Sequence, residues 1–91
     1  MEAKLATRSL YYNPDVDTLD IWIGDPSSET HGDPMTENLI SKLDAKDNVI
    51  GYEIIQLSNL DAEDMEAMPK EVRALLRESA NRLSLAIKLR S

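Results

Sequence analysis

The chain of 91 residues contains no cysteine, only three glycines and a single histidine. Without cysteine, neither a disulfide nor a thiolate-bound metal can stabilise a domain of this length, which buries only a modest core. Apolar packing, self-association or both must therefore supply the stability. The sequence shows no basic stretch leading into an apolar one, and no apolar run approaches the roughly 18 residues of a membrane span. We therefore expect a cytoplasmic protein without a membrane partner.

Basic side chains are scarce over most of the chain. Seventeen acidic and ten basic residues give a net charge of −7. Residues 1–68 hold 15 acidic and 4 basic side chains, whereas residues 69–91 hold 2 and 6. Phosphate binding needs clustered lysine and arginine, so this charge argues against nucleic acid as a partner. Two interpretations stay open for the acidic body: a solvated surface, or a face for a basic protein partner.

Motifs for catalysis and cofactor binding are also missing. No serine lies in a Gly-x-Ser-x-Gly elbow, and the three glycines are too far apart to form a phosphate loop. The acidic run Asp15 to Asp20 fails as an EF-hand, because Asp20 stands where glycine is required and Pro26 takes the place of the last ligand. We expect no catalytic residue, no metal ligand and no cofactor.

One alternative of a different class centres on His31. Carboxylates flank it in the same irregular segment, and a small enzyme or a metal-binding protein could use them. The residues in question are Asp25, Glu29, His31 and Asp33. One imidazole on an irregular loop is poor preorganisation for a metal, so an exposed loop histidine is the preferred interpretation.

Alternating apolar and polar residues predict an antiparallel sheet. Leu19, Ile21 and Ile23 should face the core, and the opposite face carries Thr18, Asp20 and Trp22. Asn13-Pro14-Asp15 and residues 44–48 have the composition of turns, and residues 24–34, with two prolines and two glycines, read as a loop. The expected strands are residues 5–12, 18–23, 37–43 and 49–57. These make a four-stranded sheet of two hairpins.

The remainder of the chain predicts helix. Asp61 can cap a short helical turn over residues 62–66, with Asp64 three residues on, and Pro69 suits the first position of a longer helix. The apolar stripe of that helix is Val72, Leu75, Leu76, Ala80 and Leu83. Residues 83–90 fit either a helix or a strand. The fold class is therefore α+β: one domain over residues 1–91, mainly β over 1–60 and mainly helical over 61–91, with the helix packed on the sheet.

Two stretches together resemble a bacterial and archaeal family known as domain of unknown function 2283. Residues 12–21, Tyr-Asn-Pro-Asp-Val-Asp-Thr-Leu-Asp-Ile, are similar to its opening Tyr-Asp-Pro-x-x-Asp-x-Leu-Tyr-Ile hairpin. Residues 43–54 are similar to its Asp-x-x-Gly-x-Val-Gly-Ile-Glu-Ile hairpin. Asp20 stands where an aromatic residue is usual, and Asn48 stands near the usual glycine, where asparagine tolerates left-handed geometry. The family has no assigned activity, and the resemblance implies an antitoxin-like partner of a small toxin protein.

Four side chains form the candidate interaction surface: Asp15, Asp17, Asp20 and Trp22. Trp22 lies on the polar face of its strand and would be exposed unless residues 24–34, the C-terminal tail or a second subunit covers it. Exposed aromatic residues are enriched at interfaces. Because Trp22 and the two-faced strand 49–57 leave apolar surface to cover, we expect a homodimer.

Glu53 is the candidate special carboxylate, because it lies inside the most apolar strand of the chain. A carboxylate in such a place needs a partner, and Arg8 or Lys42 could reach it from a neighbouring strand. Taken together, the sequence favours a non-catalytic protein-interaction module, antitoxin-like by resemblance, over an enzyme.

Overall fold

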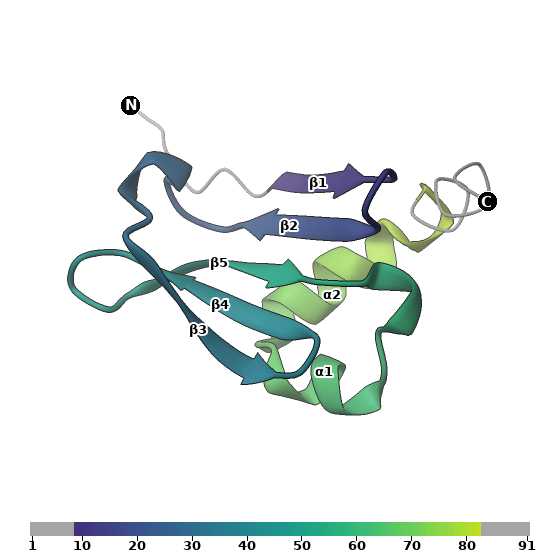
Figure 1. Ribbon diagram of the computed structural model, residues 1–91. Coiled ribbons are helices and arrows are strands. Elements are labelled where there is room, and N and C mark those ends of the chain that lie inside the picture. The colour runs from purple at the N-terminus through teal and green to yellow at the C-terminus, as the bar shows by residue number, and fades with distance from the viewer. Residues whose placement is uncertain (1–8, 83–91) are drawn as a thin grey trace.

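The computed structural model describes residues 9–82, and these form one antiparallel sheet backed by two helices (Figure 1). The sheet has five strands in the order β1-β2-β5-β4-β3, one more strand than the sequence analysis expected. The strands are β1 (Ser9–Asn13), β2 (Thr18–Trp22), β3 (His31–Thr36), β4 (Leu39–Leu43) and β5 (Val49–Ile54). The α+β class and the antiparallel pairing are confirmed.

The additional strand, β3, comes from the segment that was expected to be a loop. Five of its six residues are exposed, so it has none of the apolar alternation that marks a half-buried strand. It is an edge strand, and the edge is where Pro34, which has no backbone N–H, is tolerated in a sheet. Glu37 and Asn38 turn the chain into β4, so β3 adds a hairpin with β4 to the two that were expected, β1–β2 and β4–β5. The rest of the expected loop contains a short 3-10 helix, η1 (Pro26–Ser28), capped by Asp25.

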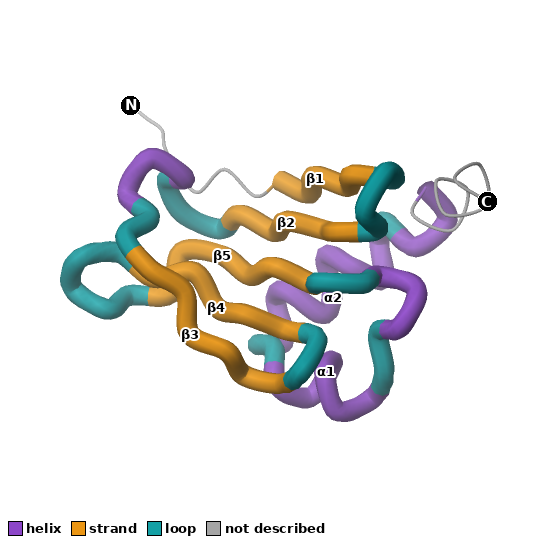
Figure 2. Tube along the Cα trace, in the orientation of Figure 1, coloured by secondary structure: helices purple, strands orange, loops and turns teal. Residues whose placement is uncertain are grey.

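The core lies on one face of the sheet, and the helices cover it. Leu19, Ile21, Leu39 and Ile54 have no exposed surface, and they form one cluster with Met68 and the helix residues Val72 and Leu76. Of the residues expected to face the core, Leu19, Ile21 and Leu76 are buried, and Ile23 is partly buried against the cluster. Figures 1 and 2 show α2 (Lys70–Glu78) behind the sheet and α1 (Ala62–Ala67) near β3. The opposite face, toward the viewer, is called the outer face below.

The helical part follows the expected signals with two corrections. Asp61 and Asp64 form a reciprocal capping box at the start of α1, as expected. Pro69 is the N-cap of α2 and not its first helical residue. Ala80 is exposed and does not continue the buried stripe; α2 ends at Glu78, and a turn at Ser79 separates it from a further helical stretch at residues 80–82. Leu83 and the tail 83–90 lie outside the described residues.

The remaining boundaries shift by a few residues. β5 ends at Ile54, after which residues Leu57–Asn59 form a second 3-10 helix, η2, so the expected strand 49–57 is too long. The first four residues of the expected strand 5–12 lie outside the described part. Between residues 9 and 82, no helix is long and apolar enough to cross a membrane.

Candidate functional site

The outer face of the sheet gathers charged and aromatic side chains from four strands and one loop. Asp20 on β2 lies directly opposite Glu53 on β5, and Tyr11 on the edge strand β1 lies opposite Asp20. In the next row, Gly51 lies between Trp22 and Lys42. These positions alternate with the buried core residues, so they point away from the helices.

Lys42 is at the centre of this surface. Its Nζ is 3.4 Å from Asp20 Oδ1, 3.6 Å from Glu53 Oε1 and 3.7 Å from Glu29 Oε2. It also lies 4.6 Å from the centroid of the Trp22 ring, within the range of a cation–π contact. We call Asp20, Trp22, Glu29, Lys42 and Glu53 the outer-face cluster.

Charge balance explains the position of the lysine. Like charges directly opposite each other on neighbouring strands destabilise a sheet, and Asp20 and Glu53 are such a pair. The ammonium between them offsets this repulsion. The Lys42 side chain is only 8% exposed, whereas those of Asp20, Glu29 and Glu53 are 32%, 36% and 35% exposed. Three partly exposed carboxylates against one buried ammonium leave the cluster with an excess of negative charge.

A glycine makes room for the cluster. A Cβ atom at position 51 would lie 2.4 Å from the carbonyl oxygen of Ile21 and 3.0 Å from Trp22 Cε3, so no larger residue fits without displacement. It would also meet Lys42 Cδ at 3.4 Å. A glycine inside a strand commonly marks such a close approach. The indole ring of Trp22 and the aliphatic part of the Lys42 side chain therefore lie over β5 at Gly51, where no side chain is in the way.

The structure brings together some of the expected site residues and separates others. Asp20, Trp22 and Glu53 belong to one cluster, and Lys42 is a partner of Glu53, one of the two that the sequence suggested. Arg8, the other suggested partner, lies outside the described residues. Asp15 is exposed in the β1–β2 turn. Glu29 was missed as a contributor here, because nothing in the sequence shows that it reaches Lys42 from beyond η1.

Asp17 does not belong to the expected interaction surface, because it is buried, with 6% of its surface exposed. Its Oδ1 accepts a hydrogen bond from the Tyr12 hydroxyl at 2.7 Å, and its Oδ2 accepts bonds from the backbone N–H and the hydroxyl of Ser58. Its φ of 62° is left-handed, a conformation that aspartate tolerates better than most residues. Asp17 therefore ties the first hairpin to η2 and has a structural role.

His31 has different neighbours from those that the sequence suggested. It lies on β3, where its Nε2 is 3.0 Å from Asp47 Oδ1 and its Nδ1 is 2.8 Å from Thr30 Oγ1. Asp25 instead accepts hydrogen bonds from the hydroxyl and the backbone N–H of Ser27, which hold its pKa below the ordinary value. Within residues 9–82, no three histidine, aspartate or glutamate side chains are grouped so that they could hold a metal ion.

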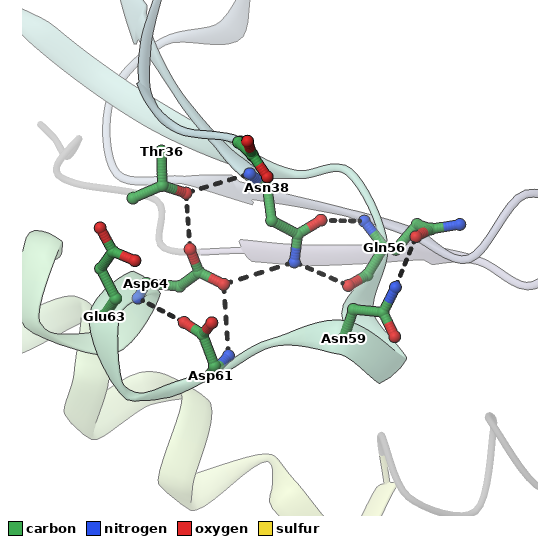
Figure 3. A pocket seen from close by; sticks show the side chains of 8 residues that line it. Thr36, Asn38, Gln56, Asn59, Asp61, Glu63 and Asp64 are labelled. Carbon is green, nitrogen blue, oxygen red and sulfur yellow. Dashed lines mark hydrogen bonds between the residues drawn. The ribbon is translucent and has the colours of Figure 1, made fainter.

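A polar cavity of about 530 Å³ lies where α1 meets the β3–β4 turn (Figure 3). Its lining consists of Thr36, Glu37, Asn38, Gln56, Asn59, Asp61, Glu63 and Asp64. The buried Asp64 accepts hydrogen bonds from Thr36 Oγ1 at 2.5 Å, from the Asp61 backbone N–H at 3.2 Å and from Asn38 Nδ2 at 3.4 Å. Burial alone would raise the pKa of Asp64, but these hydrogen bonds outweigh it and lower the pKa. Figure 3 shows that the bonds join α1 to the sheet, so the network is structural.

A comparison of the sequence with known protein families gives a match over the sheet region. A family model described as "Protein of unknown function (DUF2283)" matches residues 10–58, more than half of the chain. The chain belongs to this family. Neither the curated proteins nor the solved structures provide a match.

The two stretches that resemble DUF2283 motifs are tight hairpins in the structure. In the first, Tyr12 and Asp17 are hydrogen-bonded to each other. In the second, Asp44 accepts bonds from the backbone N–H groups of Asn48 and Lys46, and the bond from Asn48 is the main reason that the pKa of Asp44 lies below its ordinary value. The left-handed residue of this turn is Asp47, with φ of 64°, and not Asn48 as expected. These motif residues therefore shape turns.

Proposed function

We propose that this DUF2283 protein is a non-catalytic protein-interaction module that binds a basic protein through the outer face of its sheet. The outer-face cluster carries this proposal. Asp20, Glu29 and Glu53 keep about a third of their side-chain surface accessible, and among the described residues Lys42 is the cation that balances them. A cytoplasmic location and an antitoxin-like role toward a small toxin protein are parts of the same proposal.

The charge of the whole sheet region supports a basic partner. Residues 9–61 contain eleven acidic and two basic side chains. Such a field accelerates the association of an oppositely charged protein, and the acceleration declines as salt screens it. Tyr11, 74% exposed on the same face, offers an aromatic contact of the kind that is enriched at interfaces. Charge would then govern the rate of encounter, and the aromatic contact would lengthen the lifetime of the complex.

A pair of substitutions that neutralises two carboxylates tests the surface. The tagged chain is co-expressed with the product of its neighbouring gene, and the association rate of the purified pair is measured at low salt. Asp20→Asn combined with Glu53→Gln should slow association several-fold, because both changes remove negative charge from the outer face. Raising the salt to about 0.5 M should largely remove the difference between the variant and the unmodified chain.

The matched control removes the same charge elsewhere. Glu63 and Glu66 are exposed on α1, away from the outer face, so Glu63→Gln with Glu66→Gln should leave the association rate almost unchanged. If the two double variants slow binding equally, net charge and not the outer face determines the rate. If no complex forms at low salt, this gene product is not the partner and the antitoxin-like role is wrong for this pair.

A further inference from the structure

The two edges of the sheet differ in how they are protected against pairing with another strand. The β3 edge contains Pro34, has a register irregularity between Pro34 and Thr36, and contacts α1. Proline, bulges and covering helices are the usual means by which an edge is closed to further strands. Within residues 9–82, the β1 edge has none of them. Its residues, Ser-Leu-Tyr-Tyr-Asn, include no proline and no charge, and its pairing with β2 is regular.

From this difference we infer that β1 pairs with β1 of a second copy of the chain, in antiparallel register, so that two five-stranded sheets join into one. Within residues 9–82 no strand lies beyond β1. An antiparallel pair of identical strands is self-complementary about a two-fold axis, as most homodimer interfaces are. The absence of charge on β1 favours a second copy of the chain over a strongly charged partner, since the edge itself offers such a partner no opposite charge.

The register that a two-fold axis requires is chemically suitable. An axis at Tyr11 places this residue opposite Tyr11 of the partner subunit on the outer face, and aromatic cross-strand pairs stabilise sheets. It places Leu10 opposite the partner's Tyr12 on the helix side, where Leu10 and Tyr12 already pack against the core. Five residues form a short contact of less than about 1,200 Å², so the dimer should dissociate in the micromolar range.

Pairing of this kind has a consequence for the outer face. A two-fold axis perpendicular to the sheet keeps the outer faces of both copies on the same side. Because Asp20 lies beside Tyr11 across β1 and β2, the two outer-face clusters would lie on one surface, on either side of the paired tyrosines. Tyr11 would contribute to both contacts, but the β1 inference does not rest on the binding of a basic partner. The dimer is tested on the chain alone, and the partner test changes Asp20 and Glu53 and leaves Tyr11 in place.

The experiment measures the mass of the full chain by light scattering from about 1 to about 300 μM, together with amide hydrogen exchange of residues 9–13. The unmodified chain should shift from monomer to dimer, and the β1 amides should gain protection with concentration. Tyr11→Lys places like charges opposite each other and should weaken the dimer at least about tenfold. It should leave the monomer folded, because Tyr11 is mostly exposed and Asp20 lies opposite.

Met35→Lys is the matched control, since Met35 is 43% exposed on the other edge strand, β3, and the dimer should persist. A monomer at every concentration would overturn the inference. So would a dimer that survives Tyr11→Lys or is lost with Met35→Lys. Protection of the β1 amides that does not depend on concentration would show that another segment of the chain covers this edge. If Tyr11→Lys fails to fold, the exchange measurement on the unmodified chain decides alone.

Discussion

Replacement of Lys42 by methionine should destabilise the protein, because the ammonium holds three carboxylates together. Methionine keeps an unbranched apolar side chain to lie across Gly51 and Trp22, so the change removes charge with little loss of packing. It leaves Asp20 and Glu53 directly opposite each other without a cation between them. The consequence should be a lower free energy of unfolding at neutral pH and low salt.

The size of the effect follows from exposure. Ion pairs at a surface contribute about 0.2–1 kcal/mol each, whereas breaking a fully buried pair costs about 3–5 kcal/mol. Lys42 is buried, but its three partners are about one-third exposed, so solvent screens the carboxylates after the lysine is lost. We expect the free energy of unfolding to fall by about 1–3 kcal/mol. In a domain of this size, each kcal/mol lowers Tm by about 4–8 °C.

Urea denaturation followed by the fluorescence of Trp22, the only tryptophan, measures this loss. Lys46→Met, at an exposed position in the β4–β5 turn, is the control and should change stability by no more than about 0.5 kcal/mol. A Lys42→Met variant as stable as the unmodified chain at neutral pH would refute the stabilising role of the lysine.

Three further substitutions test the rest of the fold, each by urea denaturation. Asp17→Asn should cost about 2–3 kcal/mol, because the amide turns a donor toward Ser58 while still tolerating the left-handed backbone; a change below about 0.5 kcal/mol would contradict the network. Asp64→Asn should cost about 1–3 kcal/mol at pH 7. Because the folded pKa of Asp64 is lowered, its contribution is present above the unfolded value of about 3.9 and disappears as pH falls through the folded pKa. The difference in stability between Asp64→Asn and the unmodified chain should therefore shrink as pH falls toward 3. A difference that does not change with pH would contradict the lowered pKa. Leu76→Ala should cost about 2–5 kcal/mol, and a neutral result would mean that α2 does not pack on the sheet.

The sequence predicted best those elements that are buried on one face. Strand β2 alternates without interruption, so Leu19 and Ile21 were recognised as core residues, and the capping box of α1 was visible as Asp61 and Asp64. β3 was missed because an edge strand with both faces in solvent needs no apolar residues. Its pairing depends on the neighbouring strand β4, which no local pattern shows.

The candidate site was predicted only in part for a related reason. A charged residue in a turn is assigned to the surface by default. The burial of Asp17 could not be seen locally, because one of the residues that donate hydrogen bonds to it, Ser58, is 41 positions away. The carboxylate of Glu53 was recognised as needing a cation because it interrupts an apolar strand. The convergence of Asp20, Glu29 and Glu53 on one lysine depends on strand order, which places β5 between β2 and β4.

The extent of the family match bears on which surface carries a shared function. Residues 10–58 include almost the whole sheet, whereas α1 and α2 follow the matched region. The inner face of the sheet is apolar and must be covered, and in this chain Met68, Val72 and Leu76 cover it. The inner face is therefore committed to packing. Whatever the matched region offers to other molecules comes from the outer face and the edges, and the outer-face cluster and the β1 edge both lie there. Within residues 9–82, an acidic face beside an uncovered edge strand is what supports the proposed interaction module.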